Sequence, residues 1–255
     1  MTKIVDQIRN LDTTNGINLV LGGGALKGVA HVPLLDFLEQ EKIQIKAISG
    51  TSAGALIGAL YASGRTPAEI LDFFLEHPLF RYEWMTPFSN GMFNSMKYKS
   101  YFDGKMEQSF EALSIPLHVC ATDMMKGRSV YFSEGELWHK ILASCAVPGI
   151  FRPVEVDGVL YSDGAVMDNF PIHPFLNAEL PMVGSFLRSP GSVTENQLSN
   201  KRKVLKRTIY LQRQALEHQK LEIPDVCIIH KLNDFSAFKK KDAIKMYELS
   251  KALFN

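Results

Sequence analysis

ISGTSAGALIGALYASG, residues 48–64, joins two different apolar patterns. The apolar run that ends at Ile48 predicts a buried strand, and the small apolar residues after it predict a buried helix. Between them lies Gly50-Thr51-Ser52-Ala53-Gly54, a G-x-S-x-G motif. A serine on so sharp a strand-to-helix turn needs tiny neighbours, and the helix start offers it unpaired N–H groups. The motif therefore predicts a nucleophile elbow at Ser52; the alternative is a small-residue turn without chemistry.

A second glycine-rich turn precedes this one. An apolar strand at 17–21 runs into Gly22-Gly23-Gly24-Ala25-Leu26-Lys27-Gly28, and a helical pattern follows at 29–41. Such a loop directs backbone N–H groups at negative charge. Lys27 has no Ser or Thr after it, as a Walker A loop would require, and the dinucleotide spacing G-x-G-x-x-G also fails. The loop is best interpreted as an oxyanion cradle, and a parallel strand at 43–49 would bring Ser52 to the same sheet edge.

A third turn carries a carboxylate. A hairpin is predicted over 154–161 around Asp157-Gly158, and its second strand leads into Ser162-Asp163-Gly164-Ala165. Asp163, like Ser52, is a polar side chain at a strand end with small residues after it. Asp163 is therefore a candidate functional residue.

Composition narrows the class of protein. The 255 residues are 46% hydrophobic and 22% charged, with a net charge of +1, which favours a globular protein and gives no basic excess for a nucleic-acid partner. Cys120, Cys145 and Cys227 lack metal-site spacing and indicate reduced thiols in a cytosol-like compartment. We find neither a signal peptide nor an apolar run of the ~18 residues that a membrane span needs. We expect one cytoplasmic domain over 1–255, with any lipid contact peripheral.

The rest of the chain predicts further elements of an α/β fold. Thr66-Pro67-Ala68-Glu69 is a capping box that opens a helix to about residue 77. Strands are expected at 115–122, 129–133, 182–187 and 225–229, and helices at 136–145, 197–220 and 239–253. The basic helix at 197–220 suits either a solvated face or anionic lipid. Residues 78–110, rich in aromatics and Met, suit a packed cap or the wall of an acyl pocket.

Together these motifs resemble the patatin-like phospholipase family, particularly its small bacterial members, over roughly residues 16–180. The glycine loop 22–28, the elbow 50–54 and the block Asp163-Gly164-Ala165 carry the resemblance, with Ser144-Cys145-Ala146-Val147-Pro148-Gly149 and Asn169-Phe170-Pro171 also similar. One position departs, because the family often has glycine where this chain has Ala25.

The resemblance implies a three-layer α/β/α fold with a mainly parallel sheet, and a serine acyl hydrolase acting on (lyso)phospholipids. Ser52 would be the nucleophile and Asp163 the general base of a Ser–Asp dyad, with an acyl-enzyme and neither metal nor organic cofactor. The implied oxyanion donors are Gly22, Gly23, Gly24 and Ala53, and the supporting motif residues are Lys27, Gly28, Gly50, Gly54, Gly164 and Ala165.

Two alternatives to this function stay open. One is a carboxylesterase or thioesterase on soluble esters, and the other is a non-catalytic lipid-binding module. A Ser–His–Asp triad would need a histidine after Asp163, but His173, His218 and His230 lie outside glycine-marked turns and are interpreted as structural or surface residues. His31, just past the glycine loop, is interpreted as a packing or capping residue.

Overall fold

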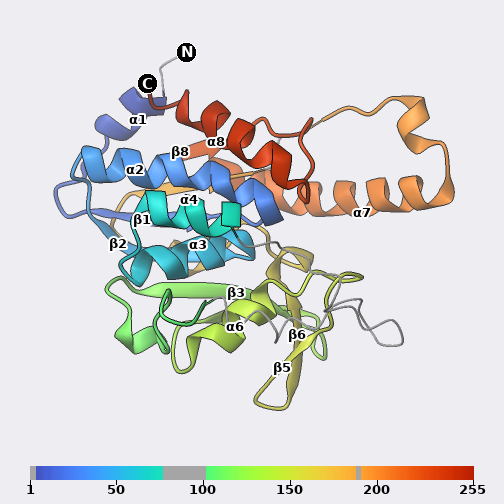
Figure 1. Ribbon diagram of the computed structural model, residues 1–255, viewed down its shortest axis with the longest axis horizontal. Helices are drawn as coiled ribbons and strands as arrows, with labels where there is room; N and C mark the ends of the chain where they lie inside the picture. The colour runs from blue at the N-terminus through green and yellow to red at the C-terminus, as the bar shows by residue number, and fades with distance from the viewer. Residues whose placement is uncertain (1–3, 77–101, 188–190) are drawn as a thin grey trace.

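A computed structural model describes residues 4–76, 102–187 and 191–255 (Figure 1). Its centre is an eight-stranded sheet in the order β5-β6-β3-β2-β1-β7-β8, with β4 also paired to β3. The strands are β1 (Ile17–Leu21), β2 (Ile45–Thr51), β3 (Leu117–Asp123), β4 (Arg128–Phe132), β5 (Val154–Val156), β6 (Val159–Asp163), β7 (Met182–Phe186) and β8 (Val226–Ile229). The predicted hairpin is present as β5 and β6, with Asp157 and Gly158 at its turn.

The sheet is mixed, with the parallel strands that the resemblance implies in five of its eight positions. β1 pairs in parallel with β2 and β7, β2 with β3, and β7 with β8, whereas β4, β5 and β6 form antiparallel pairs. β1, β2 and β7 therefore end at one edge, and the glycine loop and the Ser52 turn both lie there. This edge positions the candidate site.

Helices cover one face of the sheet densely. These are α2 (Val32–Gln40), α3 (Ala53–Ala62), α4 (Pro67–Glu76), α6 (Leu137–Ser144) and α8 (Ala243–Lys251), while the short α1 (Ile4–Arg9) contacts β8. Leu19 and Leu21 of β1 point into this larger core. The Thr66–Glu69 capping box opens α4 as predicted, since the backbone N–H of Thr66 donates to Glu69 Oε2 at 2.8 Å.

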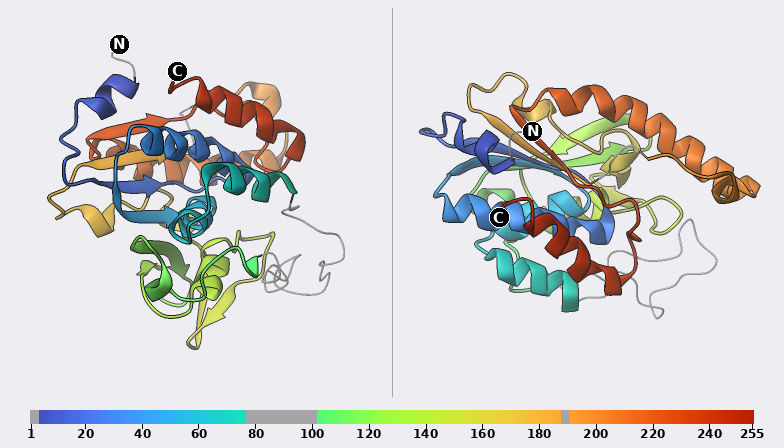
Figure 2. Two further views of the ribbon diagram at one scale, coloured as in Figure 1. Left: turned by 60° about the vertical axis from the view of Figure 1, so that its left-hand side comes forward. Right: turned by 90° about the horizontal axis from the view of Figure 1, so that it is seen from above.

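The opposite face has a smaller core of its own. Val20, which alternates with Leu19 and Leu21, packs there with Phe170, Ile172 and Phe175, from the segment around the short 3-10 helix η6 (His173–Phe175). The long helix α7 (Lys201–His218) also lies on this side of the sheet (Figure 2). The two cores give the three-layer α/β/α arrangement that the resemblance implies.

Some element boundaries differ from the predicted ones. The helix expected over 29–41 divides into a 3-10 turn, η1 (Ala25–His31), and α2, because Pro33 suits the first turn of a new helix. The helix expected over 197–220 is α7 between the 3-10 turns η7 (Glu195–Leu198) and η8 (Gln219–Glu222). The last helix is α8, shorter than the expected 239–253. Most of the aromatic stretch 78–110 falls in 77–101, outside the described residues.

Candidate active site

Ser52 occupies the predicted strand–turn–helix position, between β2 and α3. Its backbone has φ 52° and ψ −119°, a region that residues other than glycine rarely adopt. Such strain persists only where the surroundings hold it, and it collects at functional sites. Gly54 permits the tight turn, because a Cβ there would collide with the carbonyl oxygen of Leu21. The local geometry is therefore that of a nucleophile elbow.

Asp163 ends β6 and caps the 3-10 turn η5 (Gly164–Val166). Its Oδ1 accepts a hydrogen bond from the backbone N–H of Ala165 at 2.8 Å, and its own N–H donates to the carbonyl of Ala146 at 3.0 Å. The next residue, Gly164, lies against Cys120 and Thr51, so that any side chain there would meet them. The turn that carries Asp163 thus packs directly beside the residue preceding Ser52.

Ser144 and Cys145, at the end of α6, link the two candidates. Ser144 Oγ accepts a hydrogen bond from the N–H of Ser52 at 2.8 Å and donates to the carbonyl of Cys120 at 2.6 Å. Burial raises the pKa of the Cys145 thiol, the charge of Asp163 raises it further, and a hydrogen bond with the Ser52 side chain opposes both effects. Cys145 and Ser52 line the same pocket, and the N–H of Asp163 donates to the carbonyl of Ala146, the residue after Cys145. Ser52 and Asp163 are 5% and 4% exposed.

The N–H groups of the glycine loop differ in whether the described part of the fold supplies a hydrogen-bond acceptor. The N–H of Gly22 donates to the carbonyl of Ser185 at 2.9 Å, and that of Gly23 to the carbonyl of Asn169 at 3.2 Å. For Gly24, Ala25 and Ala53, by contrast, the described part of the chain offers the N–H no acceptor. Of the four expected oxyanion donors, Gly22 and Gly23 are thus occupied within the fold, whereas Gly24 and Ala53 stay candidate donors.

The backbone conformation at Ala25 is one that favours glycine, the residue that the family often has there. Ala25 has φ 51°, in the left-handed region where an L-residue other than glycine is strained by about 1 kcal/mol. Glycine, which the family often has there, would adopt this backbone without that strain. Lys27 holds the loop in place, since its Nζ donates to the carbonyl of Leu232 at 2.7 Å. This contact supports an anchoring role for Lys27.

Two buried histidines support the loop from beneath. His31 Nε2 contacts the carbonyl oxygen of Gly22 at 2.8 Å, and its Nδ1 contacts Ser185 Oγ at 2.7 Å. The same hydroxyl meets His230 Nε2 at 2.8 Å, and His230 Nδ1 contacts Ser250 Oγ at 3.2 Å. Both nitrogens of each ring are engaged within this network. The contacts agree with a structural role for both histidines.

The two histidines predict a pH dependence of stability. Burial lowers the pKa of His31 to about 4, against the hydrogen bond with Gly22, and burial together with His31 lowers the pKa of His230 to about 3. In the unfolded chain both titrate near the ordinary histidine value, so below it the unfolded state binds more protons. The contribution of the two neutral histidines to the free energy of unfolding is fully present above about pH 6.5. It is lost as the pH falls, by about 4 kcal/mol between pH 7.5 and 5 for the pair.

Urea unfolding across this pH range measures the effect. His31→Gln should show a shallower decline, because one of the two buried sites is gone, whatever its stability at pH 7.5. His173→Gln is the matched control, since His173 is 57% exposed. A wild-type stability that is flat from pH 7.5 to 5 would contradict the prediction.

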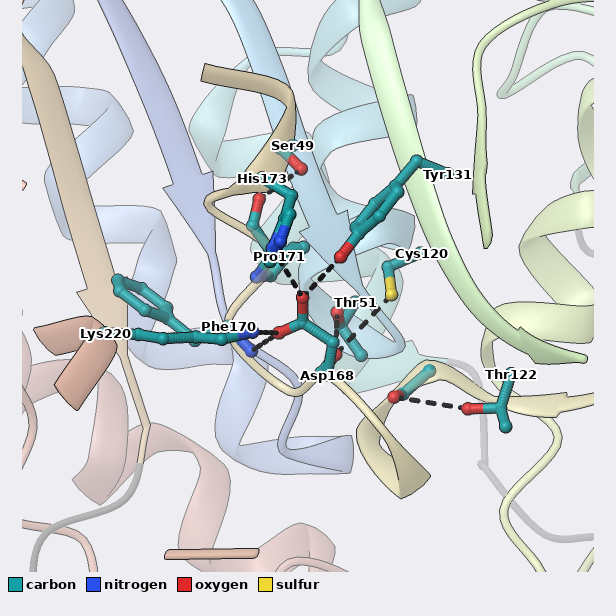
Figure 3. Close-up of polar contacts among 11 residues, drawn as sticks. Ser49, Thr51, Cys120, Thr122, Tyr131, Asp168, Phe170, Pro171, His173 and Lys220 are labelled. Atoms are coloured by element: carbon teal, nitrogen blue, oxygen red, sulfur yellow. Dashed lines mark hydrogen bonds and ion pairs between the residues drawn. The ribbon is translucent and has the colours of Figure 1, made fainter. Parts of the chain in front are cut away.

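Asp168 fixes the chain between Asp163 and the smaller core (Figure 3). Its carboxylate accepts a hydrogen bond from Tyr131 Oη at 2.7 Å and from the N–H of Phe170 at 3.1 Å, and pairs with Lys220 Nζ at 2.8 Å. Its carbonyl oxygen accepts from Thr51 Oγ1 at 2.9 Å. Asp168 is only 3% exposed, so the partners compensate a buried charge. The cluster ties the loop after Asp163 to the end of β2.

An apolar pocket opens at Ser52. It has a volume of about 80 Å³, and Ala25, Ser52, Ala53 and Cys145 line it together with the apolar side chains of Leu56, Phe74, Phe102, Leu142, Val147, Phe151 and Phe238. Phe102 belongs to the aromatic stretch 78–110, and it lines this pocket. A larger hollow of about 550 Å³, bounded by residues 102–109 and 135–138, shares Phe102 but does not reach Ser52. Of these two hollows in the described residues, the one at Ser52 combines a candidate nucleophile with an apolar lining.

No group of three or more His, Cys, Asp or Glu side chains in the described ranges is arranged to hold a metal ion. No helix within those ranges has the length and apolar character to cross a bilayer.

A strained serine between a parallel strand and a helix, beside a glycine loop and an apolar pocket, defines a hydrolase-like site on an α/β fold. The family model for patatin-like phospholipase matches residues 19–176, more than half of the chain. This protein belongs to the patatin-like phospholipase family.

Individual relatives agree with this assignment. An uncharacterised NTE family protein of Mycobacterium tuberculosis is 33% identical over 174 residues, which cover 66% of this chain and 48% of that protein. Lysophospholipase nte1 of Aspergillus fumigatus is 29% identical over 198 residues, covering 71% of this chain and 12% of the enzyme. The chain thus spans about half the length of its mycobacterial relatives.

Among solved structures, VipD from Legionella pneumophila has a similar fold. The TM-score is 0.54 at 14% identity, over 94% of this chain and 66% of that protein. This likeness concerns the fold alone.

Proposed function

We propose that this protein is a lipid acyl hydrolase that cleaves fatty-acyl esters of phospholipids or lysophospholipids through Ser52 and Asp163. The observation that carries the proposal is the strained Ser52 in an apolar pocket, with Asp163 on a turn that packs against Thr51, the residue before Ser52. Family membership supports a lipid hydrolase in general terms, and a relative is named a lysophospholipase.

In the proposed reaction, Ser52 Oγ attacks the ester carbonyl carbon while Asp163 takes its proton. The carbonyl oxygen becomes an oxyanion, which the N–H groups of Gly24 and Ala53 would stabilise; one such donor is typically worth ~3–4 kcal/mol. The C–O bond then breaks, the alcohol leaves with the proton, and an acyl-enzyme remains. Water, deprotonated by Asp163, hydrolyses that ester and releases the fatty acid.

The environment of each group fits its proposed role. A carboxylate is an intrinsically weaker base than histidine, so it needs a desolvated setting to serve here. Asp163 is 4% exposed, and the turn that carries it is held by Thr122, whose Oγ1 donates to its carbonyl oxygen at 2.9 Å. The carboxylate is not among the groups that line the described pocket, which suits a base that acts on Ser52 rather than on the acyl chain.

Labelling with a fluorophosphonate tests the proposal. Such a probe traps an activated serine as a covalent adduct, so wild-type protein should gain one adduct, and peptide mapping should place it on Ser52. A lipid-binding module without catalytic activity would form none. Absence of an adduct on folded protein would therefore overturn the proposal. Turnover of phospholipid vesicles against short soluble esters then separates a phospholipase from a carboxylesterase or thioesterase.

A further inference from the structure

Helix α7 exposes its apolar side to solvent. Val204, Leu205, Ile209 and Leu211 are all exposed, Leu205 by 62%. The side turned toward the protein is mainly polar instead: Arg213 and Gln214 are half-buried, as is Tyr210, and Glu217 is 6% exposed. A surface helix normally does the reverse, with its apolar side on the core. This orientation leaves the apolar side of α7 available to something outside the chain.

The helix belongs to an arm whose flanking residues contact the glycine loop and Asp168, near the candidate active site. We call residues 191–222 the arm; Figure 1 shows α7 extending well beyond the sheet. The chain approaches it from the end of β7, where Leu187 lies against Gly24 of the glycine loop. It returns through η8, where Lys220 pairs with the buried Asp168 at 2.8 Å. Any surface that held the arm would therefore hold the edge of the sheet that carries Ser52.

The charge of α7 selects the kind of surface. Its sequence contains six basic residues, Lys201, Arg202, Lys203, Lys206, Arg207 and Arg213, and a single acidic one, Glu217, which is buried. Basic residues beside an exposed apolar side are the pattern of helices that lie in the interface of an anionic membrane. A second copy of the same helix would bring like charges together. The charge pattern thus favours anionic lipid over self-association.

We propose that the arm docks on anionic membranes through the apolar side of α7, and so presents the Ser52 pocket to its lipid substrate. The proposal deepens the proposed function and rests on it for the substrate, while the docking itself requires no hydrolysis. Leu205 and Ile209 would enter the boundary between headgroups and acyl chains. Lys201 and Arg202 would meet the lipid phosphates.

Vesicle co-sedimentation tests the docking apart from catalysis. All proteins carry Ser52→Ala, so that the vesicles stay intact. We expect binding to an equal mixture of phosphatidylcholine and phosphatidylglycerol, and little to phosphatidylcholine alone. Leu205→Glu/Ile209→Glu should weaken binding at least about ten-fold, because two apolar anchors become charged. The matched control is Ile244→Glu/Leu249→Glu in α8, where both side chains are 47% exposed and the added charge is the same.

A second variant examines the charge contribution. Lys201→Gln/Arg202→Gln should weaken binding by on the order of ten-fold or more, since each basic residue near an anionic surface contributes about five-fold. With Ser52 restored, the arm variants should hydrolyse a short soluble ester like the wild type and lose activity only on anionic vesicles. Loss on the soluble ester as well would mean that the substitutions act on the site itself, against the proposal.

Three other outcomes would overturn the docking proposal. They are equal binding of the α7 and α8 double variants, equal binding to both vesicle types, and a dimer in light scattering that only the α7 variant abolishes. The last would assign the apolar side of α7 to a second copy of the chain. Vesicle binding by a protein that forms no fluorophosphonate adduct would retain the docking and refute the hydrolase.

Discussion

Replacing Ser52 by alanine is expected to lower kcat/KM on acyl esters by about 10⁵-fold or more, to the level left by binding and oxyanion stabilisation. The reason is that, among the described residues that line the pocket, the other nucleophilic group is the Cys145 thiol, and its burial raises its pKa and disfavours the reactive thiolate. The fold should survive, because alanine is smaller than serine and the hydrogen bond from Ser52 to Ser144 comes from its backbone N–H, which alanine retains. Steady-state hydrolysis of a short nitrophenyl ester measures the loss.

Ser63→Ala is a matched control for this change. Ser63 ends α3, and its Oγ donates to the carbonyl of Ala59 at 2.7 Å, one helix length away from the elbow. The control should retain wild-type turnover. Unchanged turnover in Ser52→Ala would instead remove Ser52 from the mechanism, and the pocket would have to be interpreted as a binding site.

Replacing Asp163 by asparagine is expected to lower kcat by about 10⁴-fold, the cost typical of removing the acid from a serine-hydrolase constellation. Asparagine has nearly the same shape and can still accept the hydrogen bond from the N–H of Ala165. The loss would therefore report proton transfer rather than a collapsed turn. Pre-steady-state kinetics should show both acylation and deacylation slowed, because Asp163 serves in each.

Two comparisons make the Asp163 result specific. Asp157→Asn removes an exposed carboxylate from the turn of the same hairpin, at φ 51°, which asparagine tolerates, and should leave kcat unchanged. His173→Ala should also retain activity, because His173 does not line the Ser52 pocket. It stacks on Tyr131 instead and lies 4.0 Å from Asp168. An active Asp163→Asn with an inactive, folded His173→Ala would replace the dyad by a histidine-based mechanism.

Local patterns were sufficient for much of the fold. The hairpin at Asp157 and the capping box at Thr66 depend on neighbouring residues, and the structure confirms both. The parallel sheet joins distant strands, and its prediction came from the family resemblance. The elbow at Ser52 is equally local, since the size of its neighbours dictates the turn. The division of the helix expected over 29–41 was missed, although Pro33 was a signal for a new helix start.

The support of the site could not be predicted, because it joins residues far apart in sequence. Ser144 meets Ser52 across 92 positions, and Lys220 meets Asp168 across 52. Spacing and periodicity carry no information about such pairs. Similarly, only the folded register reveals that the N–H groups of Gly22 and Gly23 already have acceptors. The glycine pattern predicted where the loop lies, but not which of its N–H groups already have acceptors within the fold.

The segment after Asp163 has two attachments, and they have a consequence for evolution. The first is Asp168, five residues past Asp163, with its cluster of polar partners. The second is Phe170, two residues further, which packs in the smaller core against Phe186 with ring centroids 5.4 Å apart. A change in side-chain volume at Phe186 would move this segment and also Gly22 of the glycine loop, which lies against the same ring, although Phe186 does not line the pocket. Selection for altered turnover should therefore accept substitutions in the smaller core, at residues that do not line the Ser52 pocket.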